Sequence, residues 1–242
     1  TGAIERHMVF ADNDRPGVML ASAGRTFLNH YGVAVGRKVG IYTSNDSAYG
    51  AAIDLKKAGV DVVGIVDLRD NPTGKAVDEA RALGIEINHG RAVVSVGGRL
   101  RVSSMTIAPK NGGASRTVDI DALLVSAGWT PSVHLFSQSR GKVAFDETTK
   151  RFLPGTYAQD CVSVGACNGT DSLDATIAEA LKAGEKAAKE AGGTAKGVKL
   201  KVYGSEGWTG GVVGEAPGAG PDKTVKAFVD FQNDVTAKDV KL

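Results

Sequence analysis

The regular alternation of apolar strands and amphipathic helices between residues 37 and 129 constrains the fold of this chain more than any other feature. Apolar residues recur there first in short unbroken runs and then at helical spacing, and this change of period separates strands from helices. The predicted strands are 37–43, 60–69, 85–90, 91–109 with a hairpin turn at Gly97–Gly98, and 118–128, and the predicted helices are 47–59 and 73–84, each closed by a glycine, Gly59 and Gly84. This order implies an α/β fold with a parallel, doubly wound sheet and right-handed crossovers.

The pattern changes after residue 142. Residues 142–155 indicate two short strands around a turn, and residues 160–169 indicate a buried strand that ends in glycine. A linker or irregular loop is expected at 192–222, because this stretch holds ten glycines and two prolines. Near the end of the sequence, Thr236 and Asp239 stand at the spacing of a capping box, which predicts the start of a helix.

A long alanine-rich helix is predicted at 171–192. Ser172 or Asp171 can cap its start, and Gly192 can close its end. The preceding strand, glycine and helix together place backbone N–H groups at a helix N-terminus, which is an arrangement suited to binding an anion.

The turn after the first strand, residues 43–48, lacks the glycines that a dinucleotide site of this class needs. It reads T-S-N-D-S-A where a dinucleotide-binding turn reads G-x-G-x-x-G, and no glycine lies between Gly40 and Gly50. Glycines let the backbone approach the pyrophosphate, whereas a carboxylate at Asp46 repels it. The turn therefore favours a nucleotide site that has decayed, although a functional cofactor turn remains an alternative.

Polar residues around this turn have local roles in the interpretation that we favour. Ser44, Asn45 and Asp46 cap the helix that follows. An acid after the second strand, Asp67, stands where such folds place a ribose-binding carboxylate, but here we expect it to bond to local backbone or to Arg69.

Charge and hydropathy exclude several classes of function. The formal net charge is +2, from 29 basic and 27 acidic residues, so nothing in the charge suggests a nucleic-acid or membrane-surface partner. No apolar run is long enough to span a bilayer, and the N-terminal residues do not form a signal peptide. The two cysteines do not make a disulfide framework, so a cytoplasmic location is expected. The start at Thr1 and the end at Leu242 suggest a piece of a longer polypeptide.

The cysteines and histidines do not predict a metal or disulfide site. Cys161 and Cys167 are separated by a spacing that fits neither a redox motif nor a zinc half-site, and we interpret them as ordinary thiols near the end of a buried strand. The four histidines are scattered without metal-ligand spacing, so no metal is expected. No residue is a convincing catalyst.

Three segments share a small residue beside a glycine at the end of an apolar strand. They are Thr1-Gly2-Ala3 with Arg6, Ala127-Gly128 with Pro131, and Gly165-Ala166 before the long helix. Together they resemble the crossovers and the final strand-G-D-helix of flavoproteins with two dinucleotide-binding domains, the fold of disulfide reductases. Ala166 stands where that family has the aspartate that binds the ribitol of FAD, and an alanine cannot make this bond.

Long runs such as DNDRPGVMLA and NDSAYGAA make the resemblance more specific. With SAGWTPSVHL, VGACNGTDSL and FVDFQNDVTAKDVKL, they are similar to the alpha subunit of heterotetrameric sarcosine oxidase over essentially the whole chain. The resemblance implies an oxidoreductase complex of alpha, beta, gamma and delta subunits. That complex demethylates sarcosine oxidatively to glycine and transfers the one-carbon unit to tetrahydrofolate.

The resemblance also implies cofactors and site residues. The disulfide-reductase-like module of the alpha subunit holds NAD, the beta subunit holds FAD, FMN lies at the alpha–beta interface, and tetrahydrofolate binds a domain that would follow Leu242. A first strand with its glycine loop would precede Thr1, so NAD binding by this chain alone is expected to be weak or absent. The residues expected to contact NAD are Thr1, Gly2, Ala3, Gly165, Ala166, Leu173 and Thr176.

We therefore expect an inserted Rossmann-like domain at 34–125. Residues 1–33 and 126–192 would form the remnant of a first dinucleotide-binding domain, 193–227 a glycine-rich linker, and 228–242 the start of a following segment. Two other functions stay open. The chain can be a subunit-contact scaffold without a ligand, or a subunit of a related proline or opine dehydrogenase.

Overall fold

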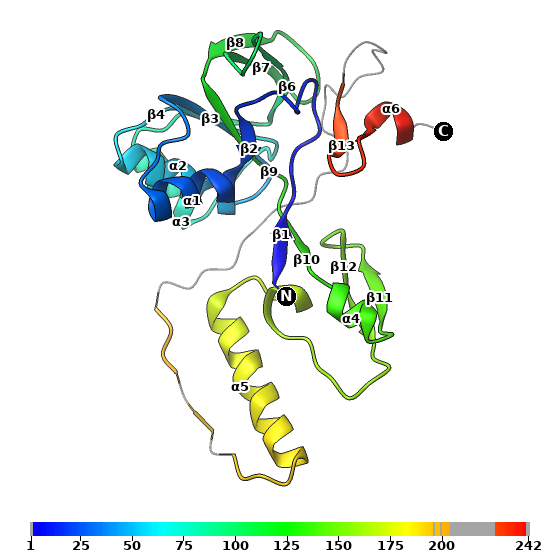
Figure 1. The fold of residues 1–242 in the computed structure, drawn as a ribbon. Coiled ribbons are helices and arrows are strands. Elements are labelled where there is room, and N and C mark those ends of the chain that lie inside the picture. The colour runs from blue at the N-terminus through cyan, green and yellow to red at the C-terminus, as the bar shows by residue number, and fades with distance from the viewer. Residues whose placement is uncertain (1, 196, 199, 204–225, 241–242) are drawn as a thin grey trace. The chain divides into compact units, whose positions relative to one another are not determined.

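The structure, a computed structural model, describes residues 2–195, 197–198, 200–203 and 226–240. The described residues fall into two compact units (Figure 1). A smaller unit contains residues 2–4 and 129–203, and a larger unit contains residues 5–128 and 226–240. Thr1, one of the residues expected to contact NAD, lies outside the described residues.

A five-stranded parallel sheet forms the centre of the larger unit, in the order β2-β9-β3-β4-β5. Its strands are β2 (Val18–Leu20), β3 (Lys38–Thr43), β4 (Asp61–Asp67), β5 (Ile87–His89) and β9 (Ala122–Ser126). The chain moves outward from β3 to β4 and β5, then returns to β9 on the other side of β3. All neighbouring strands in this sheet are parallel, which confirms the predicted α/β class.

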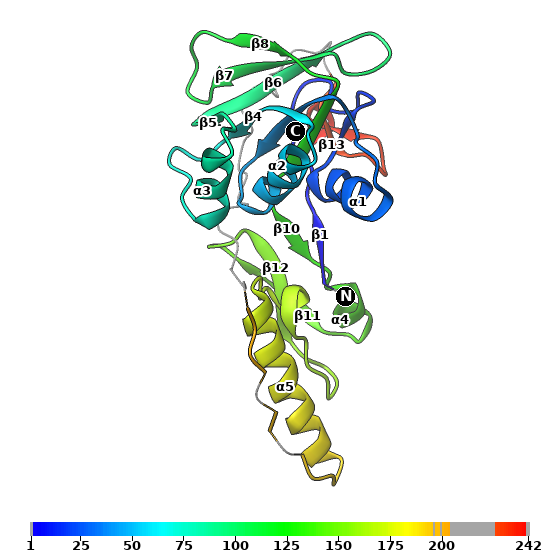
Figure 2. The same ribbon diagram turned by 90° about the vertical axis from the view of Figure 1, so that its left-hand side faces the viewer.

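Helices cover one face of this sheet, and a second sheet covers the other (Figure 2). The helices are α1 (Ala21–Tyr31), α2 (Ser47–Lys57) and α3 (Lys75–Ala82). The second sheet is antiparallel and contains β6 (Arg91–Gly97), β7 (Ser104–Pro109) and β8 (Arg116–Asp119). Its alternate side chains, including the buried Val93 and Ile107, pack against Tyr42 and Leu123 of the central strands.

Glycines end two of these helices as the sequence predicts. Gly59 follows α2 with φ +84°, and Gly84 follows α3 with φ +71°. These left-handed conformations favour glycine, because a Cβ crowds the backbone there.

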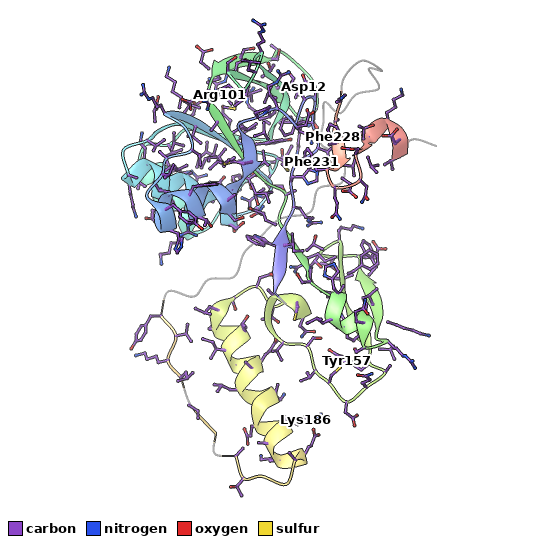
Figure 3. All side chains as sticks on the ribbon, in the orientation of Figure 1. Asp12, Arg101, Tyr157, Lys186, Phe228 and Phe231 are labelled. Atoms are coloured by element: carbon purple, nitrogen blue, oxygen red, sulfur yellow. The ribbon has the colours of Figure 1, made fainter. Side chains whose placement is uncertain are left out.

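Residues 226–240 fold back onto the larger unit. They contain β13 (Phe228–Asp230), β14 (Val235–Thr236) and α6 (Ala237–Val240). Asn13 is 3% exposed, accepts a hydrogen bond from the Phe228 amide at 2.8 Å, and donates one to the Phe228 carbonyl at 2.8 Å. The Phe228 and Phe231 rings stack with their centroids 5.4 Å apart (Figure 3). The side-chain amide of Asn13 therefore bonds both the N–H and the C=O of a residue more than two hundred positions away, as the backbone of a neighbouring strand does.

The capping box at the start of α6 is present. The Asp239 carboxylate accepts hydrogen bonds from the Thr236 amide at 2.8 Å and from the Thr236 hydroxyl at 2.6 Å. The sequence spacing had predicted this pairing.

The smaller unit consists of short strands and one long helix. A two-stranded sheet pairs β1 (Ala3–Glu5) with β10 (Trp129–Pro131). The remaining elements are α4 (His134–Gln138), the antiparallel hairpin of β11 (Lys142–Asp146) and β12 (Arg151–Thr156), the 3-10 helix Gly165–Asn168, and α5 (Leu173–Glu190). Ser172 is the N-cap of α5 by its backbone conformation but makes no side-chain capping bond, and Gly192 follows the helix with φ +79°.

Two predicted strands differ from the structure. Residues 160–164 form no strand: Val162 is 62% exposed, and the described part of the smaller unit places no strand alongside this segment for it to pair with. The stretch 118–128 divides between β8 and β9, which belong to different sheets. Asp121 causes this break, since its carboxylate accepts hydrogen bonds at 2.9 Å from the amides of Arg37 and Lys38.

The sheet also includes β2 and is covered by α1, although both precede residue 34, where we expected an inserted domain to begin. The division into an inserted domain and a remnant domain stays a prediction. Among the described residues, no helix has the length and apolar character needed to cross a membrane.

Candidate functional site

A pocket of about 730 Å³ in the smaller unit gathers most of the residues expected to contact NAD. Gly2, Gly165, Ala166, Leu173 and Thr176 all line it. Ala3 begins β1 directly after Gly2 and does not itself line the pocket. Segments far apart in the sequence therefore meet at one cavity. The first and third small-residue motifs contribute to it, whereas Ala127, Gly128 and Pro131 of the second motif do not line it.

Position 165 requires glycine, because a residue with a Cβ does not fit there. Its φ is +74°, and a Cβ there would lie 2.8 Å from Cγ2 of Thr176. The backbone at Gly165 thus turns directly over the first turn of α5, and the absent side chain permits this close approach.

Glu179 holds the loop between the 3-10 helix and α5. Its carboxylate accepts one hydrogen bond from the Gly165 amide at 2.8 Å and another from the Thr170 hydroxyl at 2.5 Å. The Gly165 amide is therefore already bonded inside the loop, so it is not free for a phosphate. Sequence reasoning missed Glu179 because this role depends on a contact between residues 14 positions apart.

The first turn of α5 contributes the dipole of an 18-residue helix to the pocket. Leu173 is the first helical residue and is 58% exposed. Backbone N–H groups at the start of a helix lack intrahelical acceptors and favour an anion. Ala166 presents no carboxylate to the same cavity, so no acid at that position opposes an anionic ligand.

The two cysteines differ from the prediction. No buried strand holds them: Cys161 is exposed and Cys167 is half-buried, and both line the pocket. The Cys167 thiol donates a hydrogen bond to the Val164 carbonyl at 3.2 Å. The apolar residues around them suggested a buried strand, but this segment is an exposed extended stretch followed by a 3-10 helix.

In the larger unit, an ion-pair network occupies the turn where a dinucleotide would bind. Asp67 is fully buried and accepts hydrogen bonds from Nη2 of Arg69 at 2.7 Å and from the Arg69 amide at 2.9 Å. Nη1 of Arg69 contacts the Asp46 carboxylate at 2.7 Å, and the Tyr49 hydroxyl donates to Asp67 at 2.7 Å. The prediction that Asp67 bonds to local backbone or to Arg69 is confirmed.

The pKa values in this network follow from burial and pairing. Burial raises the pKa of the Tyr49 hydroxyl above its usual range, and the neighbouring Asp67 charge raises it further. Burial alone would lower the pKa of Arg69, but the paired carboxylates of Asp67 and Asp46 outweigh it, so this pKa is also raised. At neutral pH, Arg69 therefore keeps its charge and Tyr49 keeps the proton that it donates to Asp67.

Side chains also close the neighbouring crevice between β3 and β9, the point where the order of strands reverses and where such sheets usually bind ligands. Nδ2 of Asn45 donates to the Ser126 carbonyl at 3.1 Å and to the Ser126 hydroxyl at 3.0 Å. Oδ1 of Asn45 accepts a hydrogen bond from the Ser47 amide at 2.9 Å. Of the three residues predicted to cap α2, only Asn45 bonds to its start. Asp46 is the N-cap by position but makes no side-chain capping bond and pairs with Arg69, and the buried Ser44 hydroxyl has no hydrogen-bond partner among the described residues.

The part of the chain that the structure describes holds no group of three or more His, Cys, Asp or Glu residues placed to bind a metal ion.

Comparisons with known proteins place these observations in a family. No protein-family model matches the chain. The sarcosine oxidase subunit alpha of Rhizobium meliloti (strain 1021) is 37% identical over 244 residues, which cover 100% of this chain and 24% of that protein. The sarcosine oxidase subunit alpha of Corynebacterium sp. (strain P-1) is 35% identical over 198 residues, which cover 79% of this chain and 20% of that protein.

Solved structures agree on the fold. L-proline dehydrogenase from P. horikoshii superimposes with a TM-score of 0.55 at 23% identity, over 81% of this chain and 34% of that one. Thioredoxin reductase from T. acidophilum superimposes with a TM-score of 0.53 at 19% identity, over 77% of this chain and 61% of that one. These likenesses confirm a Rossmann-like fold of the disulfide-reductase type.

The sequence match spans the entire chain at an identity well above that of the structural likenesses. The chain also covers only about a quarter of the length of the curated relatives that it matches. The chain therefore belongs to the family of sarcosine oxidase alpha subunits, as the counterpart of about a quarter of their length.

Proposed function

We propose that this chain is the part of a sarcosine oxidase alpha subunit that contributes to NAD binding through the pocket of the smaller unit. The complete enzyme would demethylate sarcosine oxidatively to glycine and transfer the one-carbon unit to tetrahydrofolate. The single observation that carries the NAD proposal is the gathering of Gly2, Gly165, Ala166, Leu173 and Thr176 around one cavity.

The residues of the pocket fit a dinucleotide in three respects. Among the described atoms, none lies within 4 Å of where a Cβ of Gly2 would stand, so the backbone there can approach a ligand closely. The start of α5 favours the charge of a pyrophosphate. Ala166 cannot bond to the ribitol of FAD, which favours NAD over FAD. A bound NAD supplies a nicotinamide ring that accepts a hydride.

In this proposal the larger unit has an architectural role. Its turn lacks glycine, and the Asp46, Arg69 and Asp67 network fills the place of a pyrophosphate. A phosphate would have to displace a paired carboxylate there. The free energy lost with that ion pair would exceed the free energy gained from hydrogen bonds between the phosphate and the few backbone amides of the turn.

Further features of the proposal follow from the family. FAD, FMN and the beta, gamma and delta subunits would belong to the complete complex, together with a tetrahydrofolate-binding domain of the full subunit. A cytoplasmic location stays a prediction. No residue of this chain is assigned a catalytic role.

A second candidate function, a surface for contact with other subunits, is favoured by the exposure of α5. The helix has 18 residues, and none of them is buried by the described part of the chain. One side of α5 lines a groove together with residues 157–164. The residues from the end of the helix include Ala183, Lys186, Ala187 and Ala191, and Tyr157 and Lys186 are labelled in Figure 3. A scaffold of this kind need not exclude NAD binding.

Replacing Leu173 tests the NAD proposal. Leu173→Asp places a carboxylate at the first residue of α5, and we expect NAD affinity to fall about tenfold through repulsion of the pyrophosphate. The same carboxylate interacts favourably with the helix dipole, so the thermal stability of the chain should not fall. Ligand-detected NMR titration of NAD, with the chain alone and within the full-length subunit, measures the effect.

Leu173→Asn is the matched control, because it has nearly the same shape as aspartate without the charge. Its NAD affinity should stay within about twofold of the parent protein, since an exposed neutral side chain neither attracts nor repels the ligand strongly. Equal affinities for the Asp and Asn variants, or no NAD binding by any of the proteins, would contradict the proposal.

A further inference from the structure

Asp171 is the only charged residue among the described residues that line the pocket. It lies two positions before the first residue of α5, in the loop that the pocket shares with Thr170 and Ser172. An uncompensated carboxylate there would oppose the anionic ligand that the start of α5 favours. Whether a cation neutralises this carboxylate therefore determines whether the pocket can accept an anionic ligand.

Arg151, the first residue of β12, neutralises Asp171 through two parallel hydrogen bonds. Nη1 of Arg151 lies 2.9 Å from Oδ1 of Asp171, and Nη2 lies 3.0 Å from Oδ2. The side chains are 11% and 20% exposed, respectively, so solvent screens this pair only partly. Such bidentate pairs are the strongest and most directional ion pairs in proteins.

The guanidinium also lies near a second carboxylate, because Asp146 is the cross-strand partner of Arg151 and the Arg151 charge contributes to lowering the pKa of Asp146. Nε of Arg151 is buried and has no hydrogen-bond partner among the described residues. The Glu179 carboxylate accepts its hydrogen bonds from the Gly165 amide and the Thr170 hydroxyl. Both hydrogen bonds of the guanidinium to described residues nevertheless go to Asp171, which lines the pocket.

We propose that the Arg151–Asp171 ion pair sets the charge selectivity of this pocket and adapts it to a ligand that carries a pyrophosphate. The inference rests on the proposed NAD-binding function and adds to it the pair that makes the pocket tolerate an anion. Neither side chain acts on the ligand chemically; both are specificity-determining residues.

The direction in which NAD affinity changes in three variants tests this inference. Arg151→Met leaves the Asp171 charge uncompensated and should weaken NAD binding about tenfold, while Asp171→Asn leaves the Arg151 charge uncompensated and should strengthen it several-fold. The double variant, Arg151→Met with Asp171→Asn, should return to within about twofold of the parent protein. A pair that only holds the loop in place would instead give weaker binding for both single variants.

Two controls separate charge in the pocket from other effects. Lys189→Met and Glu185→Gln make the same changes of net charge in an exposed pair near the far end of α5, with a Nζ–Oε1 distance of 2.6 Å, and should leave NAD affinity unchanged. Adenosine, which carries no phosphate, should bind all the variants about equally.

The titrations use the full-length subunit and the chain, with thermal unfolding to confirm that each variant folds. Opposite signs for the single variants support the inference. The inference would be overturned if both single variants bound NAD more weakly, if all the proteins had the same NAD affinity, or if adenosine affinity changed in parallel with NAD affinity. None of these results would contradict NAD binding itself. Failure of every protein to bind NAD, the parent included, would overturn the proposed function and this inference with it.

Discussion

Arg69→Met is expected to lower the free energy of unfolding of the larger unit by about 3–5 kcal/mol, the range measured when one partner of a buried ion pair is removed. Asp67 has no exposed surface and depends on Arg69 for most of its hydrogen bonds. Methionine keeps the apolar bulk of the side chain but returns neither the charge nor the donors, so the buried carboxylate keeps only the backbone amide and the Tyr49 hydroxyl.

Hydrogen exchange at the buried amides of β4, measured at increasing denaturant, reports the loss of unfolding free energy in the larger unit rather than in the whole chain. Lys57→Met is the control, since Lys57 pairs with Glu79 at 2.6 Å but the two side chains are 55% and 41% exposed. It should cost at most about 1 kcal/mol. A loss for Arg69→Met as small as that of the control would mean that the turn network does not hold the unit together.

Asn13→Ala should detach residues 226–240 from the larger unit. The change removes hydrogen bonds to the amide and carbonyl of Phe228 and to the Met8 carbonyl. The Phe228 carbonyl keeps its contact with Nε2 of His7 at 3.3 Å, whereas a buried group that loses its partner costs about 1–3 kcal/mol before relaxation. Because the free segment can regain bonds to water, we expect local opening rather than global unfolding. Hydrogen exchange at the Phe228 amide should accelerate at least about tenfold, while exchange in β3 stays unchanged.

Asn233→Ala is the matched control, since Nδ2 of Asn233 donates to Asp230 at 2.7 Å in an exposed turn of the same segment. It should change exchange at Phe228 by less than about twofold. Unchanged exchange at Phe228 in the Asn13 variant would show that the apolar contacts of Phe228 and Phe231 suffice to hold the segment.

The sequence was most informative where local pattern and tertiary structure agree. The strands β3, β4 and β5 and the helices α2 and α3 were predictable, because apolar period and terminal glycines specify them locally. The strand β2 and the helix α1 were not predicted. The strand has only three residues, all half-buried, and α1 buries only Ala21 and Gly24, so neither shows a long apolar pattern, although Gly32 ends α1 with φ +66°. The apolar residues at 160–164 predicted a strand because the sequence does not show whether a partner strand is present.

The candidate site was predictable only in part. Glycine and small-residue motifs located the backbone that lines the pocket, because glycine has a local conformational signature at Gly165. Arg151 and Glu179 carry no such signature, and their roles depend on which elements the fold brings together. The Asp67–Arg69 contact was predictable because only one residue separates the partners.

The central claim is that a dinucleotide belongs to the pocket beside α5 and not to the turn after β3. Amide chemical-shift mapping with NAD, on the isotopically labelled chain, tests it most directly. The account predicts shifts that saturate at Gly165, Ala166 and Leu173, with no change at Ser44–Ser47. Saturating shifts at Ser44–Ser47, with none around Gly165, would contradict it.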